Sequence, residues 1–124
     1  MRVLAVALVS VVVISHLGFL VLEMFFWTAP LGLRIFGMSA EQAEASRVLA
    51  MNQGLYNGFL AFGLIWALWT RRLDLKLFFL GCVVAAGLFG AITAKLSILW
   101  VQAMPAALAM ACVLLAERDP RRRS

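Results

Sequence analysis

Four long stretches without a charged side chain dominate the sequence, at residues 3–22, 48–70, 77–94 and 96–116. An α-helix needs about 20 consecutive apolar residues to cross the roughly 30 Å hydrocarbon core of a bilayer. Each stretch is close to that length, and 65% of the 124 residues are hydrophobic. A soluble globular protein needs more polar surface than this composition supplies. The sequence therefore predicts an all-α membrane protein, built as a four-helix transmembrane bundle.

Local signals predict where the helices begin and end. We expect helices over about 3–27, 39–69, 75–94 and 98–116, within one domain that spans residues 1–124. The first apolar run is longer than the ~7–15 residues of a signal-peptide core, so we expect the protein to keep it.

The segment between the first two helices contains Pro30, Gly32 and Gly37, which break the helical pattern and predict a loop. Ser39 to Gln42 then has the spacing of a capping box, which predicts that the second helix begins at Ser39. Its roughly 30 residues would measure about 45 Å, more than the hydrocarbon core, so its first turns should lie at the outer interface.

Basic residues are unevenly distributed between the two ends of the predicted helices. One side carries eight of the 11 basic residues: Arg2, Arg71, Arg72, Lys76, Arg118, Arg121, Arg122 and Arg123. The other side carries Arg34, Arg47 and Lys95. The positive-inside rule then places both termini and the hairpin near Arg72 in the cytoplasm. We expect a multi-pass protein of the cell (inner) membrane, with the lipid bilayer as partner and no nucleic acid despite the net charge of +5.

The first predicted helix carries an ionisable face. His16, Glu23 and Trp27 project to one side, because seven residues turn an α-helix through nearly two full circles. Glu23 is the only acid inside a predicted span. A carboxylate at membrane depth is costly, so it should be protonated, paired or open to water.

The second predicted helix carries a polar arc, about 140° wide at 100° per residue. Its members are Asn52, Gln53, Tyr56 and Asn57. Gly54 and Gly58 form an adjacent stripe of small residues, which lets a neighbouring helix approach closely.

The predicted topology brings these polar groups to a similar depth. The first helix runs outward and the second inward, which places Asn52 and Gln53 level with Glu23 in the outer half of the membrane. Gln102 begins the last, inward-running helix. We therefore predict a polar ligand-binding pocket below the outer surface, formed by His16, Glu23, Trp27, Asn52, Gln53, Tyr56, Asn57 and Gln102.

This set of side chains suits a small amphipathic or cationic molecule. Glu23 would be the charge partner or proton acceptor, His16 a proton relay, and the aromatic rings of Trp27 and Tyr56 faces for a cation. The leading hypothesis is recognition or transport of such a molecule. Transport would favour a homodimer, because four short helices rarely enclose a complete path.

Two other functions fit the same residues. A membrane enzyme could transfer protons on a lipid-like substrate, in the manner of an isomerase, with His16 or Glu23 as general acid or base. A small structural subunit of a membrane complex could use the polar groups only to bond helices together. One His and one Glu lack a third strong ligand for zinc, so we predict no metal. We also predict no cofactor, because no phosphate-binding glycine loop or haem ligand pair is present.

Four blocks of the sequence resemble a known family. They are HLGFLVLEMFFW (16–27), RIFGMS (34–39), NQGLYNGFLAFGLIW (52–66) and VQAMPAALA (101–109). They are similar to the signature blocks of a bacterial and fungal family of small four-helix membrane proteins, known as domain of unknown function 1304. The resemblance implies an integral membrane protein, and the matching positions include all eight pocket residues named above. It implies no established role for any of them.

Overall fold

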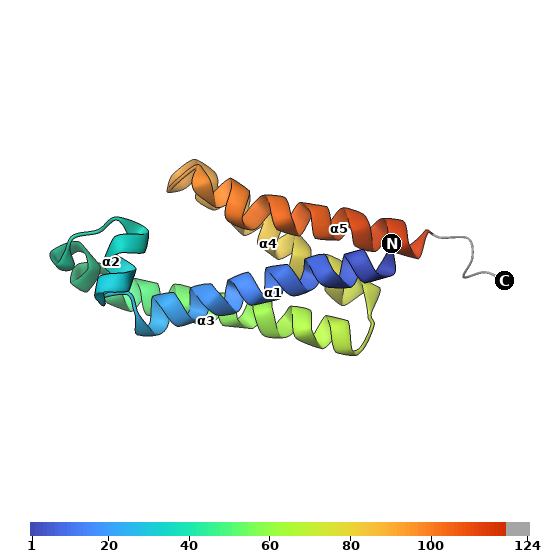
Figure 1. The fold of residues 1–124 in the computed structure, drawn as a ribbon, viewed down its shortest axis with the longest axis horizontal. Helices are drawn as coiled ribbons and strands as arrows, with labels where there is room; N and C mark the ends of the chain where they lie inside the picture. Colours follow the sequence, from blue (N-terminus) through green and yellow to red (C-terminus); the bar gives the residue numbers. More distant parts are fainter. Residues whose placement is uncertain (119–124) are drawn as a thin grey trace. The chain divides into compact units, whose positions relative to one another are not determined.

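The computed structural model describes residues 1–118 as a chain of helices (Figure 1). In order, these are α1 (Arg2–Phe25), α2 (Pro30–Phe36), α3 (Ala40–Trp69), α4 (Leu73–Thr93), the π-helical turn η1 (Leu99–Ala103) and α5 (Met104–Glu117). No strand occurs among the described residues. The predicted all-α class is confirmed.

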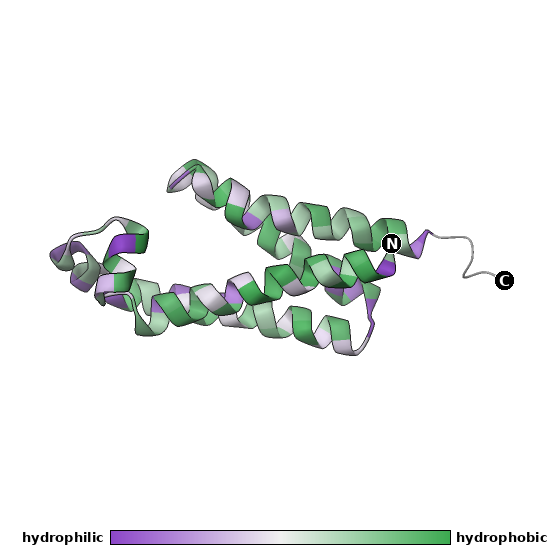
Figure 2. Cartoon of the chain, viewed as in Figure 1, coloured by the Kyte–Doolittle hydropathy of each residue, from purple (hydrophilic) through white to green (hydrophobic). Residues whose placement is uncertain are grey.

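Four helical segments are long and apolar enough to cross a membrane: α1, α3, α4 and the continuous segment Leu99–Glu117, with 24, 30, 21 and 19 residues. Figure 2 shows hydrophobic residues along them and hydrophilic residues gathered at turns and helix ends. Val3 and Ile92 are each 85% exposed. Lipid is the solvent that favours such aliphatic surface. These features are those of a multi-pass membrane protein, as predicted.

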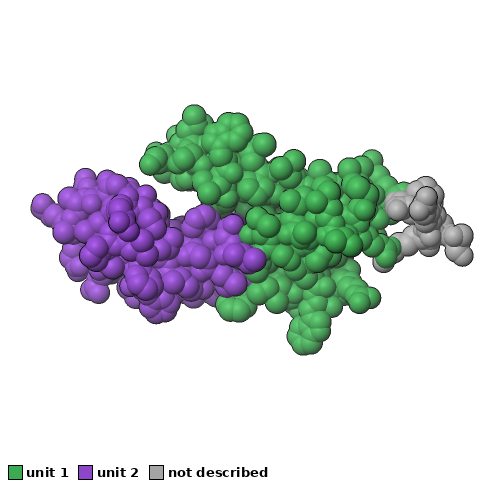
Figure 3. Space-filling model, viewed as in Figure 1, with its two compact units in different colours: residues 1–13, 62–124 green, residues 14–61 purple. Residues whose placement is uncertain are grey.

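The chain divides into two compact units (Figure 3). Unit 1 comprises Met1–Val13 and the chain from Phe62 onward, and unit 2 is Ile14–Ala61. The long helices α1 and α3 each contribute residues to both units. Of the eight predicted pocket residues, all but Gln102 belong to unit 2.

In unit 1, α4 packs against both η1 and α5. Gly87 of α4 permits the closest approach, since a Cβ atom there would lie only 2.7 Å from the backbone nitrogen of Ala103 and 2.9 Å from its Cβ. The buried face of α5 consists mainly of small residues, Ala106, Ala109 and Ala116. Small residues let helix backbones approach closely, and dispersion contacts then stabilise the pair.

In unit 2, the capping box predicted at Ser39 is present. The backbone N–H of Ser39 donates to Oε1 of Gln42 over 3.0 Å, and the backbone N–H of Gln42 donates to Oγ of Ser39 over 3.2 Å. These reciprocal bonds satisfy two backbone donors that no helical carbonyl reaches. Helix α3 begins at Ala40, directly after the capping residue, as the sequence indicates.

The loop predicted after the first helix is wrong in part, because residues 30–36 form α2. Pro30 begins the helix, where the missing N–H of proline costs no hydrogen bond. Gly37 ends it in the left-handed conformation, with φ at +66°. Pro30 and Gly37, which we interpreted as breakers, are therefore the start and stop signals of a short helix, and Gly32 is a buried residue inside it. Helix α1 also ends at Phe25, two residues before the predicted end.

Candidate functional site

The candidate site is centred on a hydrogen bond between α1 and α3 in unit 2. The side-chain amide of Asn57 donates from Nδ2 to Oε2 of Glu23 over 2.7 Å. Asn57 is only 4% exposed, and Glu23 is half-buried. The other carboxylate oxygen of Glu23, Oε1, accepts no hydrogen bond from the described residues. The pair therefore combines a fixed acid with one oxygen that a further donor or cation can use.

Two glycines explain why Asn57 reaches Glu23. A Cβ atom at Gly54 would lie 2.7 Å from Cγ of Met24 and 3.1 Å from Cβ of Glu23. A Cβ atom at Gly58 would lie 2.6 Å from Cδ1 of Leu20. The side chains of α1 thus occupy the space that larger residues of α3 would need. The predicted stripe of small residues is the contact surface between α1 and α3, and it positions the polar pair.

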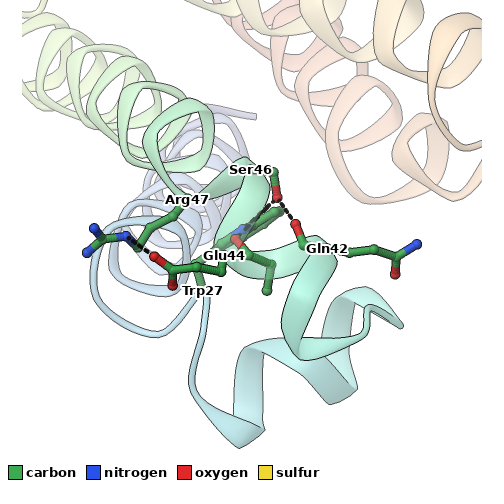
Figure 4. A network of polar contacts seen from close by, with 6 residues as sticks. Trp27, Gln42, Glu44, Ser46 and Arg47 are labelled. Atoms are coloured by element: carbon green, nitrogen blue, oxygen red, sulfur yellow. Dashed lines mark hydrogen bonds and ion pairs between the residues drawn. The ribbon is translucent and has the colours of Figure 1, made fainter.

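Trp27 is held at the corner that follows α1. Its indole Nε1 donates to Oγ of Ser46 over 3.1 Å, and its ring centroid lies 4.6 Å from that of Phe36 in α2. Ser46 in turn donates from Oγ to the backbone carbonyl of Gln42 over 2.7 Å (Figure 4). A buried indole N–H normally needs such a partner. These contacts give Trp27 a packing role, and its predicted contact with a ligand stays a prediction.

Sequence reasoning missed Ser46, whose hydroxyl oxygen accepts the hydrogen bond from the Trp27 indole. The residue precedes the apolar run of α3 and lies four positions after Gln42, on the same helical face. That spacing from the capping box was the available signal. The same turn carries an exposed ion pair between Arg47 and Glu44, with 3.3 Å between Nε and Oε1 (Figure 4). Exposed pairs of this kind contribute at most about 1 kcal/mol to stability.

His16 is buried in the middle of α1, with 1% of its surface exposed. Its ring meets the ring of Phe19 edge to face, with centroids 5.7 Å apart. Glu23 lies seven positions after His16, which corresponds to a rise of about 10 Å along the helix axis. A proton relay between them would therefore need a water molecule or a ligand as an intermediate.

The residues of the polar arc on α3 differ in how far they are buried. Asn57, next to the glycine stripe, is buried, whereas Asn52, Gln53 and Tyr56 are exposed. Tyr56 is 59% exposed, and its ring contacts Phe59 edge to face at 5.9 Å. Gln102 lies in η1 of unit 1. The structure thus brings Glu23 and Asn57 together, and the convergence of the other six residues stays a prediction.

The described residues offer no cluster of three or more His, Cys, Asp or Glu side chains that could hold a metal ion. Cys82 and Cys112 are both free thiols and are half-buried. The chemistry of the candidate site therefore depends on one carboxylate, one amide and the aromatic residues around them.

Comparison with known proteins identifies the family. Residues 10–114 match the family model described as "Protein of unknown function (DUF1304)". The chain belongs to the DUF1304 family. The predicted resemblance is therefore confirmed, and the DUF1304 match includes all eight candidate residues.

A relative of similar length supports the same assignment. The "Uncharacterized protein YpaA" of Lactococcus lactis subsp. lactis (strain IL1403) is 31% identical over 114 residues, which cover 89% of this chain and 96% of YpaA. No solved structure matches this DUF1304 chain.

Proposed function

We propose that this DUF1304 protein binds and transports a small cationic or amphipathic molecule beside Glu23, in the outer half of the inner membrane. The observation that carries the proposal is the second oxygen of the Glu23 carboxylate, which accepts no hydrogen bond within the described residues. An acid at membrane depth is costly and typically marks a functional site with a partner of its own. A cation, or a ligand that donates a hydrogen bond, would bind to this second oxygen.

The packing around the acid supports a binding role. Asn57 holds one carboxylate oxygen, and the close contact at Gly54 fixes the backbone beneath the acid. A side chain held in this way loses little conformational entropy when a ligand binds, which favours affinity. In the proposal, Tyr56 offers an aromatic face to the cation, and Asn52 and Gln53 orient its polar groups.

Ethidium, a fluorescent lipophilic cation, is a suitable probe for binding. We expect the purified full-length protein to bind ethidium in detergent, as measured by fluorescence anisotropy. Replacement of Glu23 by Gln should weaken the binding at least tenfold, because the amide cannot carry the negative charge. The matched control is Glu44→Gln, which removes an exposed acid that pairs with Arg47. Equal affinity of the wild type and Glu23→Gln would contradict the proposal.

A second measurement separates transport from the other hypotheses. Ethidium uptake into vesicles that responds to a protonophore would support proton-coupled transport. Product formation from a lipid-like substrate, in detergent and without a gradient, would support the enzyme instead. Copurification with a larger membrane protein, without ethidium binding, would support the structural subunit.

A further inference from the structure

Unit 1 contains a pocket with charged and apolar lining, which the proposed function does not use. A pocket of about 370 Å³ opens where the first turn of α1 meets the ends of α3 and α5 and the start of α4. Its charged lining consists of Arg2, Arg71, Lys76 and Glu117. The volume lies within the range of roughly 300–1,000 Å³ that is typical of small-molecule sites.

The charges in this pocket favour an anion. Three of the charged side chains are cations, and the structure gives none of them an ion pair within residues 1–118. The neighbouring Arg72 is different, because it donates from Nε to Oδ1 of Asp74 over 3.1 Å and makes a second bond from Nη2 to Oδ2. These bonds to Asp74 raise the pKa of the Arg72 guanidinium above its ordinary value. Arg72 does not line the pocket.

The backbone at Arg71 adds an independent observation. Arg71 has φ at +56°, the only positive φ among the described non-glycine residues. This left-handed conformation favours glycine, because a side chain there crowds the following carbonyl oxygen. The turn between α3 and α4 nevertheless carries a long cationic side chain at this position, and that side chain lines the pocket.

The rest of the lining is apolar and continues along the helices from the charged residues. Ala5 and Val6 follow Arg2 by one turn, Leu68 precedes Arg71, and Val113 precedes Glu117 by one turn. The pocket thus passes from cations at the helix ends to aliphatic walls within the spans. A phospholipid would match this arrangement, because its anionic phosphate diester lies next to its hydrocarbon chains.

We infer that this pocket binds the phosphate of an anionic phospholipid, with Arg2, Arg71 and Lys76 around the phosphate and the apolar walls against the start of the acyl chains. Basic pockets between transmembrane helices recognise anionic head groups in this way. The carboxylate of Glu117 also lines the pocket and has the opposite charge to the three cations. The inference is independent of the Glu23 site, which lies in unit 2.

The test uses the full-length protein in phosphatidylcholine nanodiscs with increasing fractions of phosphatidylglycerol. Native mass spectrometry measures how much phosphatidylglycerol the protein retains. Removing one pocket cation, by Arg71→Gly or Lys76→Gln, should weaken retention about fivefold, which corresponds to the ~1 kcal/mol that a basic side chain gains at an anionic surface. The basic tail is unchanged in all variants, so its contribution cancels.

Arg72→Gln is the matched control, because it removes a cation from the same turn but not from the pocket. Its retention of phosphatidylglycerol should equal that of the wild type. Arg71→Gly should also keep the thermal midpoint of the wild type or raise it, since glycine accepts the left-handed conformation. If Arg71→Gly fails to fold, Lys76→Gln alone decides the question.

Three results would overturn the inference. Arg72→Gln could weaken retention as much as the pocket variants, which would show diffuse attraction to surface charge. The wild type could fail to prefer phosphatidylglycerol to phosphatidylcholine. Millimolar inorganic phosphate could bind in place of the lipid and stabilise the protein in a manner that depends on Arg71, which would assign the pocket to a soluble phosphate compound.

Discussion

Asn57 of α3 donates a hydrogen bond to Glu23 of α1 across 34 positions of sequence, over 2.7 Å. The bond joins a side-chain amide to an acid on two long helices that are mostly apolar. Within unit 2 it therefore serves both as a link between two spans and as the element that orients the carboxylate. Substitutions at its two ends can separate these roles.

Glu23→Gln should change stability little and ligand binding strongly. The replacement amide is almost isosteric and can still accept the hydrogen bond from Asn57, so we expect a change within ~1 kcal/mol in the free energy of unfolding. Asn57→Ala should cost more, about 1–3 kcal/mol, because it leaves a half-buried carboxyl group without its donor. Thermal unfolding in detergent measures both changes.

If Glu23→Gln unfolds the protein while ethidium affinity and its pH profile in the folded fraction stay unaltered, Glu23 is a structural acid. His16→Gln should change the pH profile in the same direction as Glu23→Gln, but less, if His16 acts only as a relay.

Gly54→Leu should destabilise unit 2 by separating α1 from α3. The new side chain would have to displace Met24 and the Cβ atom of Glu23, and overpacking of this kind typically costs about 1–3 kcal/mol. Gly18→Ala is the matched control, because a Cβ atom at Gly18 meets nothing within 4 Å. It should stabilise α1 by about 0.5–1 kcal/mol through helix propensity alone. Equal thermal midpoints for the two variants would contradict the close packing at Gly54.

The bond between Trp27 and Ser46 should appear as an energetic coupling. Trp27→Phe keeps the aromatic contact with Phe36 but removes the indole donor, and Ser46→Ala removes the acceptor. Each should cost about 0.5–1.5 kcal/mol, and the double variant should cost less than the sum of the two. Strict additivity in a double-mutant cycle would mean that the hydrogen bond contributes nothing to stability.

The topology prediction depends on the asymmetry of basic residues. Reporter fusions placed after Arg72 and at the C terminus should both report the cytoplasm. Fusions near Lys95 should report the opposite side. A periplasmic signal after Arg72 would invert the depth order of the polar residues and remove the argument for an outer-leaflet site.

The proposed outer pocket should be open to water. In a background without Cys82 and Cys112, cysteines at Asn52 and Gln102 should react with a membrane-impermeant thiol reagent added outside. A cysteine at Phe62, which is 60% exposed on an apolar face of α3, should stay unreacted in the bilayer. If neither cysteine at the two polar positions reacts, the result would favour the structural hypothesis, in which the polar groups only bond helices together.

Features encoded by neighbouring residues could be predicted from the sequence. The apolar runs specify four spans, and Ser39 with Gln42 specifies the first residue of α3, because each depends on groups a few positions apart. The short helix α2 was missed because proline and glycine interrupt long helices but also begin and end short ones. The presence of Pro30 and Gly37 does not by itself distinguish a loop from a short helix, because both residue types occur in either structure.

Features that depend on a distant partner could not be predicted in full. The arc on α3 contains Asn52 and Asn57 alike, and helical periodicity cannot say which of them is buried. The answer comes from α1, which packs on Gly54 and Gly58 and so covers Asn57. The role of Ser46 likewise requires Trp27, 19 positions earlier, to turn back at the end of α1.

The number of residues in the π-helical turn Leu99–Ala103 determines how the side chains before the turn are aligned with those of α5. In this turn the backbone N–H of Met104 bonds to the carbonyl of Leu99, five residues earlier rather than four. Loss of one residue from the turn would restore the hydrogen-bond spacing of an α-helix and rotate the side chains of this segment that precede the deletion by about 100° relative to α5. A single-codon deletion here would act as a rotation of one helix segment against another, whereas most substitutions in the same turn would leave that alignment unchanged.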